Sequence, residues 1–103
     1  MMGEFMTVGR ASELSEGDMK AFEVAGVKVA VANVAGTLHA FGNVCTHRQC
    51  PLAKGELEET TVTCPCHGSQ FDVTTGAVLQ GPAQDPVESY PVRVQDDALQ
   101  VEV

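Results

Sequence analysis

The sequence predicts an all-β protein, and three observations lead to that prediction. Two cysteine–histidine pairs are present, and sixteen residues separate the end of the first pair from the start of the second. Such a gap suits two loops brought together by intervening strands, because two ligands on one helix would stand about four residues apart. Residues 27–34 alternate in the manner of a half-buried strand. Only residues 11–20 have some helical character, and Ser15–Asp18 within them favours a turn.

The strands follow one another along the chain between turn residues. The predicted strands are, in order, 21–24, 27–34, 37–41, 60–63, 71–73, 90–94 and 98–103, of which the first, fourth and fifth have the weaker patterns. Ala35-Gly36 and Gln95-Asp96-Asp97 are typical turn sequences, so each is expected to join its flanking strands in a hairpin.

The candidate metal ligands lie in Cys45-Thr46-His47 and Cys64-Pro65-Cys66-His67. Thiolate and imidazole bind transition metals tightly, and two cysteines with two histidines suit either tetrahedral zinc or one kind of 2Fe-2S cluster. Ligand count alone favours zinc. However, structural zinc sites usually take two like ligands from each half of the motif, whereas each half here supplies one of each kind. A cluster with one iron on two cysteines and the other on two histidines needs that mixed arrangement.

The wider sequence around these residues resembles a known family. Cys45–Leu52 and Cys64–Asp72 resemble the two cluster-binding boxes of Rieske 2Fe-2S proteins, and Gly81-Pro82-Ala83 resembles the proline-bearing third loop that covers the cluster. The match extends to Gly55, Leu57 and Gly76. The resemblance implies an antiparallel β-sandwich or barrel, a single domain over residues 1–103, with a smaller cluster-binding β subdomain at about 43–84.

The resemblance also implies a role for each site residue. Cys45 and Cys64 would bind the buried iron, and His47 and His67 would bind the outer iron. Ser69 would donate a hydrogen bond to a cluster sulfur and so raise the reduction potential. Phe71 stands where the respiratory subunits carry a tyrosine, so one hydrogen bond that raises the potential is absent. The loop residues Pro51, Leu52, Pro65 and Pro82 would form an apolar rim around the exposed edge.

Three readings of Cys50 and Cys66 are open. Their positions match the disulfide that links the two boxes in respiratory and photosynthetic Rieske subunits, and closing a loop of this size would stabilise the fold by about 3 kcal/mol. Both could instead be free buried thiols in a reducing cytosol. A third reading pairs Cys66 with Cys64 as a redox pair, but it gives the two histidines no role. We favour the disulfide between Cys50 and Cys66.

Charge and hydropathy restrict the partners. Fourteen acidic and six basic residues give a net charge of −8, which disfavours nucleic acid and suits transient docking to basic protein surfaces. No run of 18 apolar residues is present, and no basic segment precedes an apolar one near Met1. We therefore expect a soluble, cytoplasmic monomer.

Arg48 is expected to be solvated, and His39 is expected to be an ordinary strand residue outside the site.

These features predict a one-electron carrier that is not itself an enzyme. The resemblance implies a ferredoxin that carries electrons from a flavin-dependent reductase to a terminal ring-hydroxylating oxygenase. An alternative is the small Rieske subunit of an assimilatory nitrite reductase, which would bind that enzyme's large subunit. A different class of function is a zinc-stabilised binding module without redox activity, whose protein would be colourless rather than reddish-brown.

Overall fold

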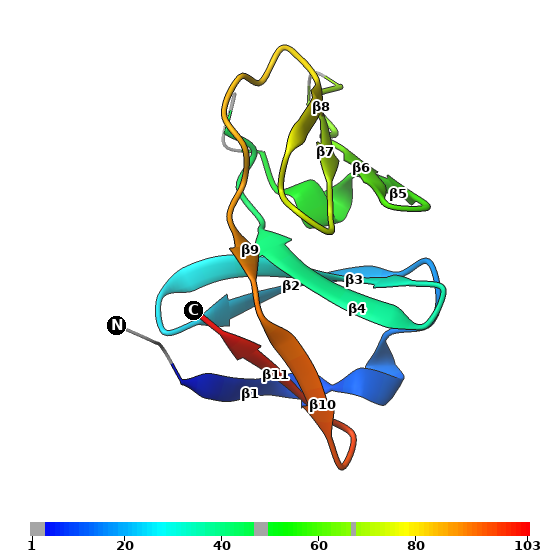
Figure 1. Ribbon diagram of the computed structural model, residues 1–103, viewed down its shortest axis with the longest axis vertical. Helices are drawn as coiled ribbons and strands as arrows, with labels where there is room; N and C mark the ends of the chain where they lie inside the picture. Colours follow the sequence, from blue (N-terminus) through cyan, green and yellow to red (C-terminus); the bar gives the residue numbers. More distant parts are fainter. Residues whose placement is uncertain (1–3, 47–49, 67) are drawn as a thin grey trace.

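The computed structural model describes residues 4–46, 50–66 and 68–103, which form three antiparallel sheets (Figure 1). The first sheet has the order β1-β11-β10, the second β2-β3-β4-β9, and the third, called here the small sheet, β5-β6-β7-β8. The elements are β1 (Phe5–Arg10), η1 (Ala11–Glu13), β2 (Met19–Val24), β3 (Val27–Val34), β4 (Thr37–Gly42), η2 (Leu52–Lys54), β5 (Glu56–Glu58), β6 (Thr61–Thr63), β7 (Gln70–Asp72), β8 (Val78–Gln80), β9 (Ser89–Tyr90), β10 (Val92–Gln95) and β11 (Ala98–Glu102). The prediction of an all-β fold is confirmed.

Tight turns fix the register of the large hairpins. Ala35 and Gly36 join β3 to β4 with φ of 51° and 92°, and Asp96 and Asp97 join β10 to β11 with φ of 52° and 67°. Two consecutive residues of positive φ match the right-handed twist of the flanking strands. Both hairpins were expected from the sequence, and both are confirmed.

The predicted strand at 90–94 is interrupted. Pro91 separates β9, which pairs with β4 in the second sheet, from β10, which pairs with β11 in the first. Proline has no backbone N–H to donate, so the chain leaves one sheet and joins the other at this residue. The sequence analysis also missed β1, β5 and β8, and two of these are only three residues long.

Strand β3 separates two apolar cores, which corrects the expectation of a half-buried strand. Val29 and Val31 on one face pack in a cluster with Leu99 and Val101, where the first and second sheets meet. On the other face, Ala30 and Ala32 belong to a cluster that reaches the small sheet and contains Phe41, Cys45, Leu52, Val62, Cys64, Phe71, Val73, Ala83 and Val87. The valines of β3 therefore face one core and the alanines face the other, and neither set faces solvent.

The small sheet lies at one end of the molecule, above the two larger sheets in the view of Figure 1. Two chain segments connect it to them, one after β4 and one before β9. Strands β1, β10 and β11 of the first sheet lie away from it, in the lower part of that view. In the part of the chain that the structure describes, no helix has the length and apolar character needed to cross a membrane.

Candidate metal centre

The first cysteine box is a loop closed at its base. Val44 forms an antiparallel bridge with Pro51, and the N–H of Cys45 donates to the carbonyl of Cys50 over 2.9 Å. Asn43 fastens the next turn, because its backbone carbonyl accepts from the Leu52 N–H and its side-chain oxygen from the Ala53 N–H, at 2.7 and 2.9 Å. The Cys45 thiol is fully buried at this base.

The second box is a tighter loop between β6 and β7. The N–H of Cys64 donates to the carbonyl of Ser69 over 2.8 Å, and the Gly68 N–H donates back to the Cys64 carbonyl over 3.2 Å. Gly68 has a φ of 79°, which glycine adopts without strain. The Cys64 side chain is buried, and its carbonyl and N–H are both used in closing the loop.

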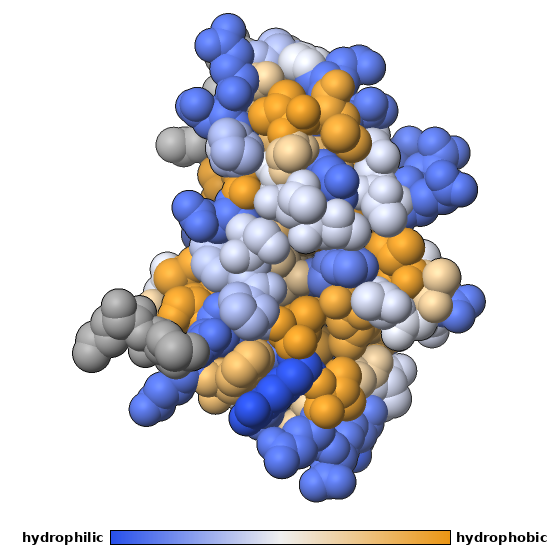
Figure 2. Space-filling view, viewed as in Figure 1, coloured by the Kyte–Doolittle hydropathy of each residue, from blue (hydrophilic) through white to orange (hydrophobic). Residues whose placement is uncertain are grey.

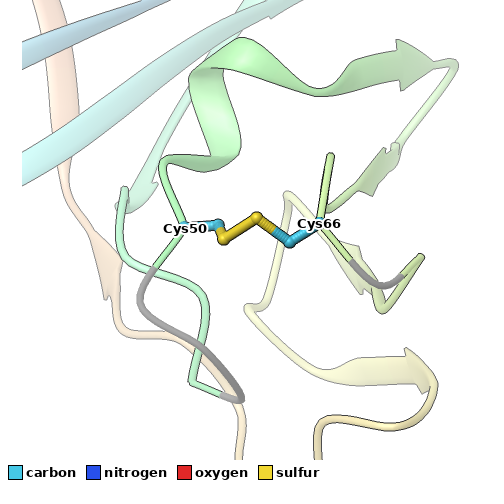
Figure 3. The surroundings of a disulfide bond; sticks show 2 residues. All are labelled: Cys50 and Cys66. Atoms are coloured by element: carbon cyan, nitrogen blue, oxygen red, sulfur yellow. A yellow bond between two sulfur atoms is a disulfide. The ribbon is translucent and has the colours of Figure 1, made fainter.

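A disulfide between Cys50 and Cys66 joins the two boxes (Figure 3). The Cα atoms are 6.4 Å apart, within the usual range, and sixteen positions separate the residues in the chain. The disulfide reading of these cysteines is confirmed. The Cys64 sulfur lies within 4.8 Å of both disulfide sulfurs, but a bonded pair has no thiolate to offer, so this sulfur group is not a metal site.

The segment between β8 and β9, residues 81–88, completes the site and is called here the third loop. The N–H of Ala83 donates to the Ser69 hydroxyl oxygen over 3.0 Å, and both residues are buried. The hydroxyl of Thr46 donates to the carbonyl of Asp85 over 2.6 Å. The third loop is therefore hydrogen-bonded to one residue of each box.

Two ionisable side chains outside the cysteine boxes have shifted pKa values. The hydroxyl and the backbone N–H of Thr74 donate to the Asp72 carboxylate and hold its pKa below the ordinary 3.8, with a smaller contribution from the charge of His39. Burial, followed by the negative charge of Glu88, raises the pKa of Tyr90 above 10.0. Tyr90 packs against the core between the two larger sheets, and Asp72 is bonded within its own turn, so neither shift concerns the buried thiols.

The structure brings together most of the predicted site residues that it describes. Cys45 and Cys64 are the free cysteines, and both thiols lie in the same apolar cluster. His47, His67 and Arg48 lie outside the described residues. Pro51, Pro65 and Pro82 are exposed, as expected for a rim, and His39 lies on β4 rather than in either box.

The expectation for Leu52 is wrong. Its side chain is fully buried at the start of η2, in the same cluster as Cys45, and does not contribute to an exposed rim. The sequence analysis also missed the roles of Asn43 and Thr46. The side chains of both residues form hydrogen bonds with backbone groups farther along the chain, and the sequence does not indicate such partners.

The donor set suits a transition-metal group. Two free thiols are unusual in an apolar cluster unless they act as small apolar residues or as ligands. Here Cys45 lies two positions before His47 in the chain, and Cys64 lies three positions before His67. The disulfide-joined loops fix where the thiols stand. The ligand types by themselves suit zinc as well as iron, and comparison with known proteins distinguishes them.

A family model described as the Rieske 2Fe-2S domain matches residues 4–91. The ferredoxin component of a naphthalene 1,2-dioxygenase system from Pseudomonas putida is 33% identical over 92 residues, which cover 89% of this chain and 88% of that protein. A cytochrome b6-f complex iron-sulfur subunit from Chlorobaculum thiosulfatiphilum is 37% identical over 94 residues, covering 91% of this chain and 51% of that protein.

Among solved structures, one titled as a complex of reduced oxygenase and oxidized ferredoxin in carbazole 1,9a-dioxygenase contains a similar chain. That chain is 28% identical with a TM-score of 0.89, and the match covers 94% of this chain and 91% of that one. The strands, the two boxes and these similarities agree. This chain belongs to the Rieske 2Fe-2S domain family, whose domain carries a 2Fe-2S cluster.

Proposed function

We propose that this chain is a one-electron carrier, the ferredoxin component that delivers electrons to a terminal oxygenase. The observation that carries the proposal is the pair of buried free thiols, Cys45 and Cys64, on two loops joined by the Cys50–Cys66 disulfide. The relatives support it, because the matched proteins include a dioxygenase ferredoxin component and a chain from an oxygenase–ferredoxin complex. The family assignment argues against the zinc-stabilised module.

The proposed ligands are Cys45 and Cys64 for one iron and His47 and His67 for the other. A bound cluster would supply a centre that accepts and releases one electron at a time. The boxes fix where the thiols stand, since hydrogen bonds close both loops at their bases. No substrate pocket is required for this role.

Ser69 is proposed to donate a hydrogen bond to a cluster sulfur. The Ser69 oxygen already accepts from the Ala83 N–H, so the hydroxyl proton remains available to donate. Donation of this kind stabilises the more negative, reduced state. Phe71, fully buried on β7, has no hydroxyl to add a second such bond.

The electron donor in this proposal is a flavin-dependent reductase, and the cell compartment is the cytoplasm, as for a ferredoxin component of an oxygenase system. The small subunit of an assimilatory nitrite reductase stays a prediction, and a stable complex with a large reductase subunit would favour it. The apolar surface suits brief contacts with a partner. Figure 2 shows an apolar patch near the top of the view, where Figure 1 places β7 and β8, and Leu79 of β8 is 52% exposed.

The first experiment is electron paramagnetic resonance of the purified protein after dithionite reduction, with iron and zinc measured on the same sample. We expect two irons per chain and a rhombic signal with an average g below that of all-cysteine 2Fe-2S proteins, because imidazole ligation changes the reduced iron. A silent spectrum with one zinc per chain would overturn the carrier proposal.

A further inference from the structure

The third loop has few attachments to the rest of the molecule. At its end, the Val87 N–H donates to the Gly76 carbonyl and the Gly42 N–H donates to the Glu88 carbonyl, each over 2.9 Å. Ala83 is buried and uses its N–H on Ser69. Within the described residues, the Thr46 hydroxyl makes the one hydrogen bond that reaches residues 84–86.

Those three residues are exposed, so little packing holds them in place. Their contact with Thr46 spans 39 positions of sequence and joins the third loop to the residue directly after Cys45. Ser69 makes the equivalent contact from the second box. One hydroxyl from each box therefore reaches the third loop, and the two contacts lie two residues apart, at Ala83 and Asp85.

We propose that Thr46 is a positioning residue that holds the third loop against the two boxes and thereby limits solvent access to the centre. The proposal rests on the proposed function for what the loop covers. A hydroxyl lost from Thr46 leaves residues 84–86 without a hydrogen bond to the boxes, so this part of the loop should open more often. Each opening exposes the thiol end of the site to water and to metal chelators.

A matched set of variants tests this role. Thr46→Val replaces the hydroxyl by a methyl group of similar size, and Thr46→Ser keeps the hydroxyl. Thr74→Val is the control, because the Thr74 hydroxyl also donates over 2.6 Å from an exposed position but its acceptor is Asp72, within the same turn of the small sheet. Thr46→Ala serves in place of the valine variant should the latter not fold.

The first measurement is the rate at which the iron-loaded protein releases iron to an excess of chelator. Thr46→Val should release iron about fivefold faster than the parent protein, the factor that corresponds to one typical hydrogen bond. Thr46→Ser and Thr74→Val should match the parent protein. The proposal is wrong if Thr46→Val behaves like Thr74→Val, or if Thr46→Ser releases iron as fast as Thr46→Val.

The second measurement does not depend on the cluster. Hydrogen exchange followed by mass spectrometry should show faster exchange in peptides covering residues 81–88 of Thr46→Val and unchanged exchange in β3, since the opening is local. Faster exchange throughout the chain would contradict a positioning role and indicate a general loss of stability. If the parent protein binds no iron, the proposed function fails, and the exchange comparison still decides the role of Thr46.

Discussion

Ser69 holds the scaffold together, and we propose that the same residue also donates a hydrogen bond to the centre. It is fully buried, its carbonyl closes the second box through the Cys64 N–H, and its hydroxyl oxygen accepts from the third loop. A buried hydroxyl with its oxygen engaged in this way points its proton to whatever acceptor remains. In this site the remaining acceptor would be a sulfur of the cluster.

Replacing Ser69 by alanine should lower the reduction potential by about 40 mV, which is the one-electron equivalent of a differential of about 1 kcal/mol between the two redox states. The cluster should still assemble, because the proposed ligands are unchanged. A redox titration followed by electron paramagnetic resonance measures the shift, with a change of the exposed Ser89 of β9 to alanine as the control. A rise in potential would show that Ser69 does not donate to the cluster.

At the scale of elements, two glycines allow backbone segments to approach each other closely. A Cβ at Gly55 would overlap the carbonyl oxygen of Thr63, and a Cβ at Gly76 would overlap that of Val87. Gly76 also has a φ of 85°. These glycines adjoin the boxes in the sequence, and they let β6 and the end of the third loop pack against their neighbours.

Gly76→Ala and Gly26→Ala make a matched comparison, because the two glycines have φ of 85° and 82° but nothing lies within 4 Å of a Cβ at Gly26. Gly26→Ala should lower the free energy of unfolding by about 1 kcal/mol, from left-handed strain alone. Gly76→Ala should lower it by about 3 kcal/mol or more, because the Val87 carbonyl must also move. Urea unfolding measures both, and equal losses would show that the contact with Val87 is unimportant.

The disulfide between Cys50 and Cys66 holds the two boxes together. Changing Cys50 and Cys66 together to serine should lower the free energy of unfolding by about 3 kcal/mol, because the unfolded chain regains the entropy of a sixteen-position loop. Thermal unfolding of the iron-loaded variant against the parent protein measures the loss. No change in midpoint would mean that the cluster and the hydrogen bonds at the loop bases already constrain the boxes fully.

At the scale of the whole molecule, charge governs encounters. A net charge of −8 on 103 residues should steer the protein toward a basic docking surface. The rate of electron transfer from its reductase should therefore fall by about tenfold or more as salt is raised, since the Debye length shortens. Stopped-flow reduction at increasing ionic strength measures it, with an uncharged chemical reductant as control. A rate independent of salt would exclude long-range steering.

The fold could be predicted from sequence where its causes are local. The hairpins at Ala35-Gly36 and Asp96-Asp97 depend on residues that accept positive φ, and β3 appears in the sequence over its observed bounds. Two of the three strands that were missed, β5 and β8, have three residues each, too few for a pattern. They exist because β6 and β7 lie beside them in the small sheet.

The sequence by itself determined the chemistry of this protein, because the two boxes are short motifs whose ligand types and spacing are properties of the chain. Only the tertiary structure decided which residues surround them. The burial of Leu52, the division of a strand at Pro91 and the contact from Thr46 to Asp85 all depend on packing between distant segments. Such contacts often end on backbone carbonyls. Every residue carries one, so the residue types in the sequence do not indicate which carbonyl a side chain will contact.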